Sequence, residues 1–357
     1  MQTKIEKVDI REGVKPSFHD AQVMEEAGRI LRNGGLVAFP TETVYGLGGD
    51  ALDGSASKKI YAAKGRPSDN PLIVHIADLE ALKAIASEIP EKARILAEKF
   101  WPGPLTMILK KSSAVPYETT GGLDTVAVRF PSHPAATALI KASGTYIAAP
   151  SANTSGRPSP TTADHVAQDM DGRIDMIIDG GAVGIGIEST IVDLTGEVPM
   201  ILRPGYITKE MLEAAVGTVT VDPAIIDGKL LKDVHPKAPG MKYRHYAPKG
   251  NLIVVEGAQD RVIEKINALV MAKEAEGKKT AVIATDETKD KYLCGIVESI
   301  GTRRDVKTIA HNLYDILRKM DTSGVSDIYS ESFEGAGLGQ AVMNRLLKAA
   351  GHHVIHV

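Results

Sequence analysis

The chain has 357 residues, of which 43% are hydrophobic and 24% are charged. This length favours two domains, and the composition is that of a folded globular protein, which excludes a single mini-domain and an extensively disordered chain. The formal net charge is −3, so there is no overall basic field to hold a polyanion. Cys294 is the one cysteine, which excludes an intrachain disulfide and a zinc site built from several cysteines.

Residues 1–13 carry charges every few positions and lack the apolar core of a secretory signal. No apolar stretch reaches the roughly 18 residues that a membrane span needs. We therefore expect a cytoplasmic protein that makes no membrane contact. Aromatic residues make up only 4% of the chain, too few to favour a stacking platform for single-stranded nucleic acid.

The hydrophobic pattern predicts alternating helices and strands up to residue 220. Apolar residues recur at helical spacing between residues 20 and 33, and the apolar run 36–39 before Pro40 is typical of a buried strand that feeds a loop. Further strands are expected at 72–76, 105–109, 125–130, 146–149, 174–178, 189–194 and 200–202. Further helices are expected at 56–63, 91–100, 135–142 and 208–215. This alternation predicts an α/β domain whose twisted sheet is mixed rather than purely parallel.

The periodicity fades between residues 221 and 249, where residues 237–249 contain four Lys or Arg and no acid. We predict a basic linker at 221–249 that joins a first domain, 1–220, to a second one, 250–357. Strands expected at 252–255 and 280–285, with helices at 259–275 and 308–321, make the second domain a smaller, Rossmann-like α/β unit. The sequence Gly335-Ala-Gly-Leu-Gly339 is like a fragment of a dinucleotide loop, but no strand is predicted before it, so the signal is weak.

Three polar clusters are candidates for a binding site. Residues 40–50, PTETVYGLGGD, follow a strand, where ligands of α/β sheets bind, although a tight turn explains them equally well. Lys64 and Arg66 flank a glycine at a helix end and suit a polyphosphate and a carboxylate, although the helix dipole alone also favours cations there. Residues 148–161, AAPSANTSGRPSPT, crowd polar side chains into a loop that three prolines stiffen, and we expect that loop to bind a ligand.

Other catalytic signatures are missing from the sequence. It has no Walker loop, no nucleophile elbow and no zinc-protease helix motif. Arg129 and Arg203 lie in apolar strands, where an arginine usually occupies an edge or a salt bridge. The histidines near the C-terminus lack carboxylate or cysteine partners, so we expect no metal site built from protein side chains.

The motifs PTETVYGLG, KGRPSDNPLIVH, FWPGPLT, VAVRFP, APSANTSGRPSPT, GIEST and ILRPG follow one another with the spacings of the YrdC family. The match spans about residues 17–217. The linker sequence APGMKYRHYAP and the small domain resemble the long, two-domain form of that family, the L-threonylcarbamoyladenylate synthases.

The resemblance implies a nucleotidyltransferase reaction. L-threonine, bicarbonate and ATP, with Mg²⁺, would give threonylcarbamoyl-AMP and pyrophosphate. A separate transferase would then move the threonylcarbamoyl group to an adenosine beside the anticodon of tRNA. The chain itself would need at most a weak contact with tRNA.

The resemblance also implies roles for single residues. The cations and polar residues that line the nucleotide and phosphate pocket correspond to Lys64, Arg66, Ser151 and Asn153. Further positions that touch ATP correspond to Asn70, Thr125, Ser159, Arg203 and, in a linker that folds back over the nucleotide, Tyr243. The threonine side corresponds to Thr43, His75, Arg129, Ala149 and Ser189. Arg66 is also placed toward the threonine carboxylate, and spacing leaves open whether Thr41 or Thr43 points into the pocket.

Two other functions compete with this one. A module that binds double-stranded RNA or tRNA is disfavoured by the acidic balance and the few aromatic residues. A carbamoyl-transfer maturation factor would need cysteine-rich zinc fingers, which a chain with Cys294 alone cannot form. The small domain could regulate, close over the site or dock the transferase, and the sequence does not choose among these roles.

Overall fold

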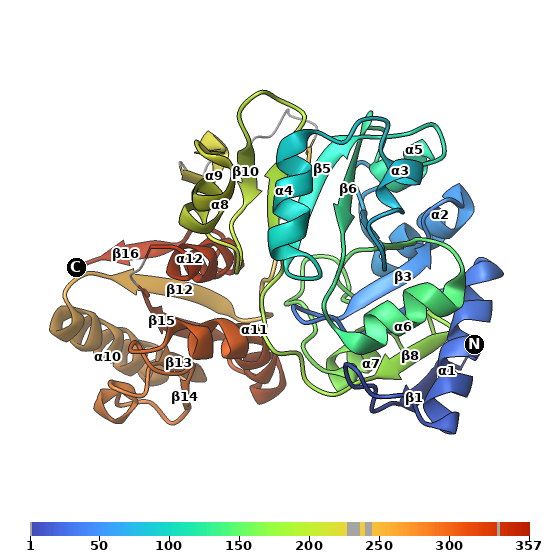
Figure 1. Ribbon diagram of the computed structural model, residues 1–357. Helices are drawn as coiled ribbons and strands as arrows, with labels where there is room; N and C mark the ends of the chain where they lie inside the picture. The colour runs from blue at the N-terminus through green and yellow to red at the C-terminus, as the bar shows by residue number, and fades with distance from the viewer. Residues whose placement is uncertain (1, 227–235, 240–244, 334–335) are drawn as a thin grey trace. The chain divides into compact units, whose positions relative to one another are not determined.

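The computed structural model describes residues 2–226, 236–239, 245–333 and 336–357 (Figure 1). The contacts within the chain divide it into two compact units. The first unit comprises Met1–Ser155, Ser159–Gly184 and Glu188–Lys242. The second comprises Gly156–Pro158, Ile185–Ile187 and Tyr243–Val357.

The described part of the first unit is built on a mixed sheet of 11 strands in the order β1-β8-β2-β3-β7-β4-β6-β5-β9-β10-β11. The strands are β1 (Lys4–Lys7), β2 (Val37–Phe39), β3 (Gly46–Asp50), β4 (Ile73–His75), β5 (Leu105–Lys110), β6 (Thr125–Arg129), β7 (Ile147–Ala149), β8 (Met176–Asp179), β9 (Thr190–Asp193), β10 (Met200–Arg203) and β11 (Thr220–Val221). Strand β4 pairs in parallel with β6 and antiparallel with β7. The predicted mixed sheet is therefore confirmed.

Helices cover both faces of this sheet. They are α1 (Phe18–Arg32), α2 (Gly54–Lys64), α3 (Leu82–Ile85), α4 (Glu91–Phe100), α5 (Tyr117–Thr120), α6 (Pro134–Ser143), α7 (Ala163–Met170), α8 (Lys209–Val216) and α9 (Pro223–Ile226). Helix α1 begins after Ser17, whose hydroxyl accepts a hydrogen bond from the Asp20 amide at 3.1 Å. Helices α1 and α6 lie side by side and bury an apolar cluster against β2, β7 and β8 (Figure 1).

The same sheet face continues from β7 onto β4, β6 and β5. The register of these central strands decides which side chains lie on it. His75 on β4 pairs with Arg129 on β6, and Arg129 pairs with Thr106 on β5. Paired residues point to the same side of a sheet, so these three polar side chains lie on one face. Their apolar neighbours on this face form a buried cluster of Ile73, Ile108, Ala127, Ile191, Leu202 and Ala238. Ala238 belongs to the predicted linker, so the linker contributes a side chain to the packing of this face.

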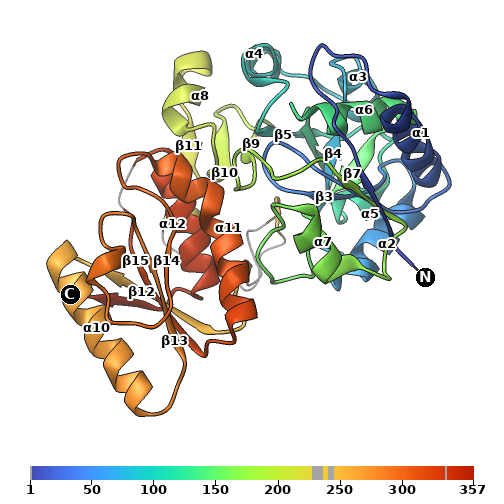
Figure 2. The same ribbon diagram turned by 90° about the horizontal axis from the view of Figure 1, so that it is seen from below.

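The second unit contains a parallel sheet in the order β14-β13-β15-β12-β16 among its described residues. Its strands are β12 (Asn251–Glu256), β13 (Thr280–Ala284), β14 (Val297–Ser299), β15 (Asp327–Glu331) and β16 (Val354–His356). Its helices are α10 (Gln259–Ala275), the 3-10 turn Lys289–Lys291, α11 (Val306–Ser323) and α12 (Leu338–Ala349). Helix α10 covers one face, and α11 and α12 pack together on the other (Figure 2). This layering confirms the predicted Rossmann-like unit.

The structure differs from the expectations from sequence in three details. The second half of the polar segment 40–50, interpreted as a loop, is strand β3. Its glycines permit close packing, because a Cβ on Gly48 would lie 2.7 Å from Cγ2 of Ile147. The expectation that no strand precedes the sequence at 335–339 was also wrong, since β15 precedes it, and α12 begins within it at Leu338. The segment 221–226, assigned to the linker, begins in β11 and continues as α9.

Across the described ranges, none of the helices combines the length and the apolar character needed to cross a membrane.

Gly28 sets how closely α1 approaches α6, and this predicts a measurable cost for adding one methyl group. A Cβ at Gly28 would lie 2.5 Å from the backbone oxygen of Ala142. We expect Gly28→Ala to lower the free energy of unfolding by about 1–3 kcal/mol, although alanine is the better helix former. The single tryptophan, Trp101, is buried in the first unit. Its fluorescence as a function of urea concentration therefore measures the free energy of unfolding.

The matched control for this prediction is Gly196→Ala. The atom nearest to a Cβ on Gly196 is 3.9 Å away, so this variant should unfold at the wild-type urea concentration. Equal stability of the two variants would contradict the close approach of α1 and α6.

Candidate active site

The end of helix α2 anchors the polar loop that follows strand β7. Gly65 ends the helix in the left-handed conformation, with a φ of 62°, directly after Lys64. The Lys64 side chain is 1% exposed. Its Nζ donates hydrogen bonds to the backbone oxygens of Ser151 and Asn153 and lies 3.5 Å from Asn153 Oδ1. In return, the Lys64 carbonyl accepts from the Ser155 amide at 2.9 Å. The ammonium therefore holds the loop in place.

Inside this loop, Ser151 and Asn153 orient one another. Ser151 Oγ donates to Asn153 Oδ1 at 2.5 Å, and Asn153 Nδ2 donates to the Thr154 carbonyl at 2.8 Å. The amide oxygen of Asn153 thus faces Lys64 and Ser151. The structure brings together Lys64, Ser151 and Asn153, three of the four residues predicted as the catalytic set.

The fourth residue, Arg66, donates hydrogen bonds to the backbone of the segment that leads into β4. Its Nε donates to the Asn70 carbonyl at 3.2 Å and its Nη2 to the Pro71 carbonyl at 3.1 Å. Asn70 is 2% exposed, and its Oδ1 is buried without a hydrogen-bond donor in the described residues. A buried acceptor without a donor costs free energy, so Asn70 has capacity for a donor from a ligand or a water molecule.

The guanidinium of Arg129 forms a buried ion pair with Glu42. Its Nη2 lies 2.8 Å from Glu42 Oε1, and Glu42 Oε2 accepts from the Ser132 amide at 3.2 Å. Arg129 is 4% exposed, and its Nε has no acceptor among the residues that the structure describes. The Arg129 guanidinium can therefore donate a hydrogen bond to a further carboxylate.

His75, beside Arg129 on the sheet, is uncharged. Burial and the neighbouring Arg129 guanidinium lower the pKa of His75 to about 3. Its Nδ1 lies 3.0 Å from the Ile73 carbonyl, which assigns the ring proton to Nδ1 and leaves the lone pair on Nε2. At neutral pH, His75 therefore presents a hydrogen-bond acceptor.

The turn before β3 distinguishes Thr41 from Thr43. Thr41 Oγ1 donates to the Val44 carbonyl at 2.7 Å and accepts from the amides of Thr43 and Val44, so its hydroxyl is used by the turn. Thr43 Oγ1 has a single partner in the described chain, Thr41 Oγ1 at 2.9 Å. The geometry therefore favours Thr43 as the hydroxyl with spare capacity.

Ser189 is bound from two sides. Arg203 donates from Nε to the Ser189 carbonyl at 3.1 Å and from Nη2 to Ser189 Oγ at 3.2 Å. Thr106 Oγ1 lies 2.8 Å from the same Ser189 Oγ. Arg203 also approaches the Pro239 carbonyl at 3.5 Å, so residues 236–239 border this part of the site.

Three residues of this neighbourhood were not singled out from the sequence: Glu42, Thr106 and Glu188. Glu188 is buried and accepts a hydrogen bond from Ser159 Oγ at 2.6 Å. Each of the three lies inside a motif that carries the resemblance, which is the signal that could have marked them.

The remaining predicted residues are placed differently. Ala149 ends β7 and pairs with Ile73, so it can offer only backbone groups. Thr125 begins β6, at the opposite end of that strand from Arg129. It borders an open depression of about 780 Å³ with Lys110, Lys111, Tyr117, Asp124 and Thr195. The structure therefore does not bring Thr125 together with His75 and Arg129. Tyr243 lies outside the described residues.

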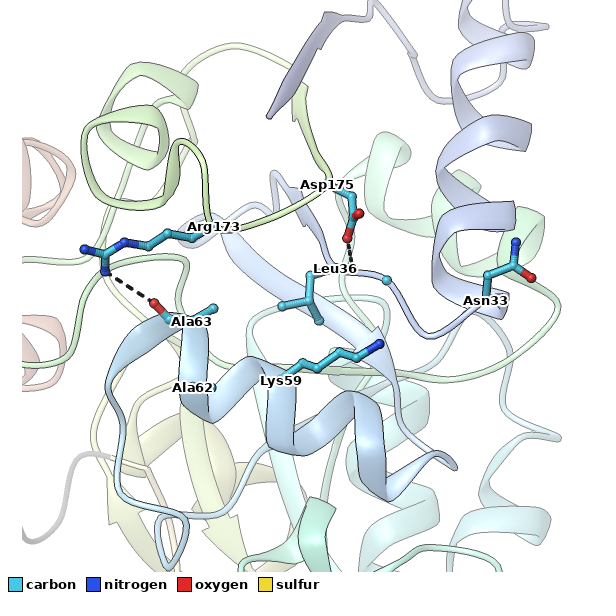
Figure 3. Close-up of a pocket in the computed structure, with 8 residues that line it drawn as sticks. Asn33, Leu36, Lys59, Ala62, Ala63, Arg173 and Asp175 are labelled. Atoms are coloured by element: carbon cyan, nitrogen blue, oxygen red, sulfur yellow. Dashed lines mark hydrogen bonds between the residues drawn. The ribbon is translucent and has the colours of Figure 1, made fainter. Parts of the chain in front are cut away.

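Another depression, of about 700 Å³, contains none of the predicted site residues (Figure 3). Its charged side chains bind the backbone: Lys59 donates to the Gly34 carbonyl at 2.6 Å, Arg173 to the Ala63 carbonyl at 3.4 Å, and Asp175 accepts from the Leu36 amide at 2.7 Å. The first two of these contacts tie α2 to the chain around it. Lys59 is therefore a useful comparison for Lys64 on the same helix.

The low pKa of His75 predicts a pH dependence of stability. A buried neutral histidine favours folding above its unfolded pKa of about 6.5, and this contribution is lost as the pH falls from there toward 3. We expect the loss to be about 1.4 kcal/mol per pH unit. Urea unfolding followed by Trp101 fluorescence at pH 7, 6 and 5 should show a shallower pH slope for His75→Asn than for the wild type. Identical slopes would contradict a neutral His75.

Comparisons with known proteins place this geometry in a family. The family model Sua5_yciO_yrdC, described as telomere recombination, matches residues 29–205. The model described as threonylcarbamoyl-AMP synthase, C-terminal domain, matches residues 207–351. The second match begins within the first unit, at residue 207, and covers most of the second unit.

The threonylcarbamoyl-AMP synthase of Pyrococcus abyssi is 53% identical over 334 residues, covering 93% of this chain and 95% of the relative. That of Bacillus subtilis is 49% identical over 356 residues, covering 99% and 100%. A crystal structure of P. abyssi Sua5 complexed with L-threonine superposes with a TM-score of 0.92 at 50% identity, covering 99% of this chain and all of that one. The chain belongs to the threonylcarbamoyl-AMP synthase family.

Proposed function

We propose that the chain joins L-threonine, bicarbonate and ATP into threonylcarbamoyl-AMP, with release of pyrophosphate. The single observation that carries this proposal is the grouping of Arg129 and neutral His75 on one sheet face, with Ser189 hydrogen-bonded to Thr106 of the same face. Its support is the identity of 53% to a threonylcarbamoyl-AMP synthase over nearly the whole chain. The product is the activated intermediate for threonylcarbamoyladenosine in tRNA.

The chemistry asks for alignment and charge neutralisation more than for a covalent catalyst. The amine of threonine takes up CO₂ from bicarbonate as an N-carboxylate, and an oxygen of that group displaces pyrophosphate from the α-phosphorus of ATP. Such a transfer depends on holding two anions in line and neutralising their charge. Buried cations beside polar loops meet this demand.

We assign the amino acid to the face that carries His75 and Arg129. Arg129 would bind a substrate carboxylate through its unused Nε, and the Nε2 lone pair of His75 would accept a hydrogen bond from threonine. Thr43, whose hydroxyl has the spare capacity that Thr41 lacks, completes this side together with the backbone of Ala149 and with Ser189.

We assign the nucleotide to the loop that Lys64 anchors. Lys64, Arg66, Ser151 and Asn153 would hold the phosphates, and the unpaired Oδ1 of Asn70 would accept a donor from the nucleotide. Thr125, Ser159, Arg203 and Tyr243 are the further positions proposed to touch ATP. In this assignment, Tyr243 would close over the nucleotide and exclude water from a hydrolysable intermediate.

We propose that Mg²⁺ enters with the triphosphate, because this ion binds mainly through phosphate oxygens and water, with one or two carboxylates. In the parts of the chain that the structure describes, His, Cys, Asp and Glu side chains are nowhere grouped in threes for a metal ion.

The product implies the wider setting of the reaction. Threonylcarbamoyl-AMP must pass to a transferase that modifies tRNA, so we place the reaction in the cytoplasm with that transferase as the downstream partner. Contact of this chain with tRNA would be weak. We propose the first domain, 1–220, as the catalytic one, with the linker 221–249 and the second domain, 250–357, assisting it.

The proposed reaction is tested by following pyrophosphate release with each substrate omitted in turn. We expect release only when ATP, Mg²⁺, L-threonine and bicarbonate are all present, because the attacking group forms from the last two. Release that does not depend on threonine or bicarbonate would remove the assigned reaction. Tight, strongly salt-dependent binding of RNA would then favour the RNA-binding alternative.

The role of Lys64 is tested by Lys64→Met. This change removes the ammonium that holds Ser151 and Asn153, and a catalytic loop displaced by about 1 Å costs roughly 100-fold in rate. We expect kcat/KM for ATP to fall by at least about 100-fold in the pyrophosphate assay.

Lys59→Met is the matched control for Lys64→Met. Lys59 lies on the same helix and also donates to a backbone carbonyl, but it borders the depression in Figure 3. It should keep kcat/KM within about twofold of wild type, as expected for a change away from the site. Similar kinetics for both variants would contradict the role of Lys64.

A further inference from the structure

Thr106 is a buried hydroxyl at the site to which no role is assigned above. It lies on β5 and is 0% exposed. In the described residues its Oγ1 has one hydrogen-bond partner, Ser189 Oγ, at 2.8 Å. Ser189 Oγ has one more, Nη2 of Arg203 at 3.2 Å. Thr106 on β5, Ser189 just before β9 and Arg203 on β10 thus form a short hydrogen-bonded network.

One hydroxyl hydrogen of this hydrogen-bonded network is left without an acceptor among the described residues. Arg203 can only donate, so Ser189 Oγ accepts from it. Thr106 and Ser189 each carry one hydroxyl hydrogen, but only one of the two can be used in the bond between them. Whichever way that bond points, the other hydrogen lacks an acceptor in the described structure. Buried donors are rarely left unpaired, so a ligand atom is expected to accept it.

The charges around this hydrogen specify the kind of acceptor. Arg203 binds Ser189 directly, and Arg129 is the register partner of Thr106 on β6, on the same face. Two guanidinium groups beside one free hydroxyl hydrogen favour a negatively charged oxygen. Threonine supplies such an oxygen in its α-carboxylate, and bicarbonate supplies one in the N-carboxylate that forms from it.

We propose that Thr106 is a positioning residue: its hydroxyl donates to Ser189 Oγ, so that Ser189 directs its own hydrogen to a carboxylate oxygen of the substrate. With Arg203 and Thr106 both donating, the two lone pairs of Ser189 are occupied and its O–H has one direction left. This inference rests on the proposed function, because it takes the carboxylated amino acid as the ligand of this face.

The test replaces Thr106 by valine, which keeps the shape and removes the hydroxyl. Loss of one such hydrogen bond is worth roughly a three- to tenfold change in an equilibrium constant. We expect Thr106→Val to raise the Kd of L-threonine, measured by calorimetry without bicarbonate, if the α-carboxylate is the acceptor. If the N-carboxylate is the acceptor, the Kd of L-threonine is unchanged and the KM for bicarbonate rises instead. In both cases the KM for ATP stays within about twofold.

A double-mutant cycle separates positioning from simple packing. If Thr106 acts through Ser189, then adding Thr106→Val to Ser189→Ala should change neither constant further. Thr106→Ser keeps the hydroxyl and should restore wild-type values. Should valine prevent folding, the pair Thr106→Ala and Thr106→Ser isolates the same hydroxyl.

Thr190→Val is the matched control for Thr106→Val. Thr190 is equally buried, but its hydroxyl donates to the Ile207 carbonyl at 2.7 Å. Its loss should lower stability and leave the Kd and KM values unchanged.

Two results would overturn the proposal: wild-type values of both constants in Thr106→Val, or effects of Thr106→Val and Ser189→Ala that simply add. Failure of the proposed function itself would look different, since the wild type would then release no pyrophosphate in response to threonine and bicarbonate.

Discussion

The alternation of side chains along the central strands is the constraint on which the site depends. Because residues paired across β4, β6 and β5 must point to the same side, fixing the register of Ile73 and Ala127 in the apolar cluster also fixes His75, Arg129 and Thr106 beside it. A slip of one residue in any of these strands would turn its polar group to the opposite face. The apolar packing of the sheet thus determines where the polar groups that we propose to bind the substrate lie.

The site is held by buried polar groups, each of which is fixed by a neighbour. Lys64 holds the backbone of the 151–153 loop, Glu188 holds Ser159, and Glu42 pairs with Arg129. Such contacts are strong because little water competes for them, and they are costly if one partner is lost. We infer that the enzyme achieves alignment by preorganisation, which is what a reaction between two anions requires.

Most of the fold could be predicted because long apolar patterns dominate it. The exceptions have physical causes. Strand β1 is mostly exposed at an edge, so it lacks a buried face. Strand β15 ends in buried Ser330 and Glu331, and Glu331 looks like a surface residue in the sequence because its partners, Arg303 and Tyr292, are distant along the chain. In the site, the contact of Thr106 with Ser189 spans 83 positions of sequence. The pairing of β5 with β9 brings these two residues together, and the local sequence does not show this pairing.

The central claim is that this chain builds a threonylcarbamoyl adenylate. It is tested most directly by incubating the protein with ATP, Mg²⁺, L-threonine and ¹³C-labelled bicarbonate and identifying the nucleotide product by mass spectrometry. We expect an adenylate that contains threonine and carries the ¹³C label. An adenylate of threonine without the label, or no adenylate beyond AMP and ADP, would contradict it.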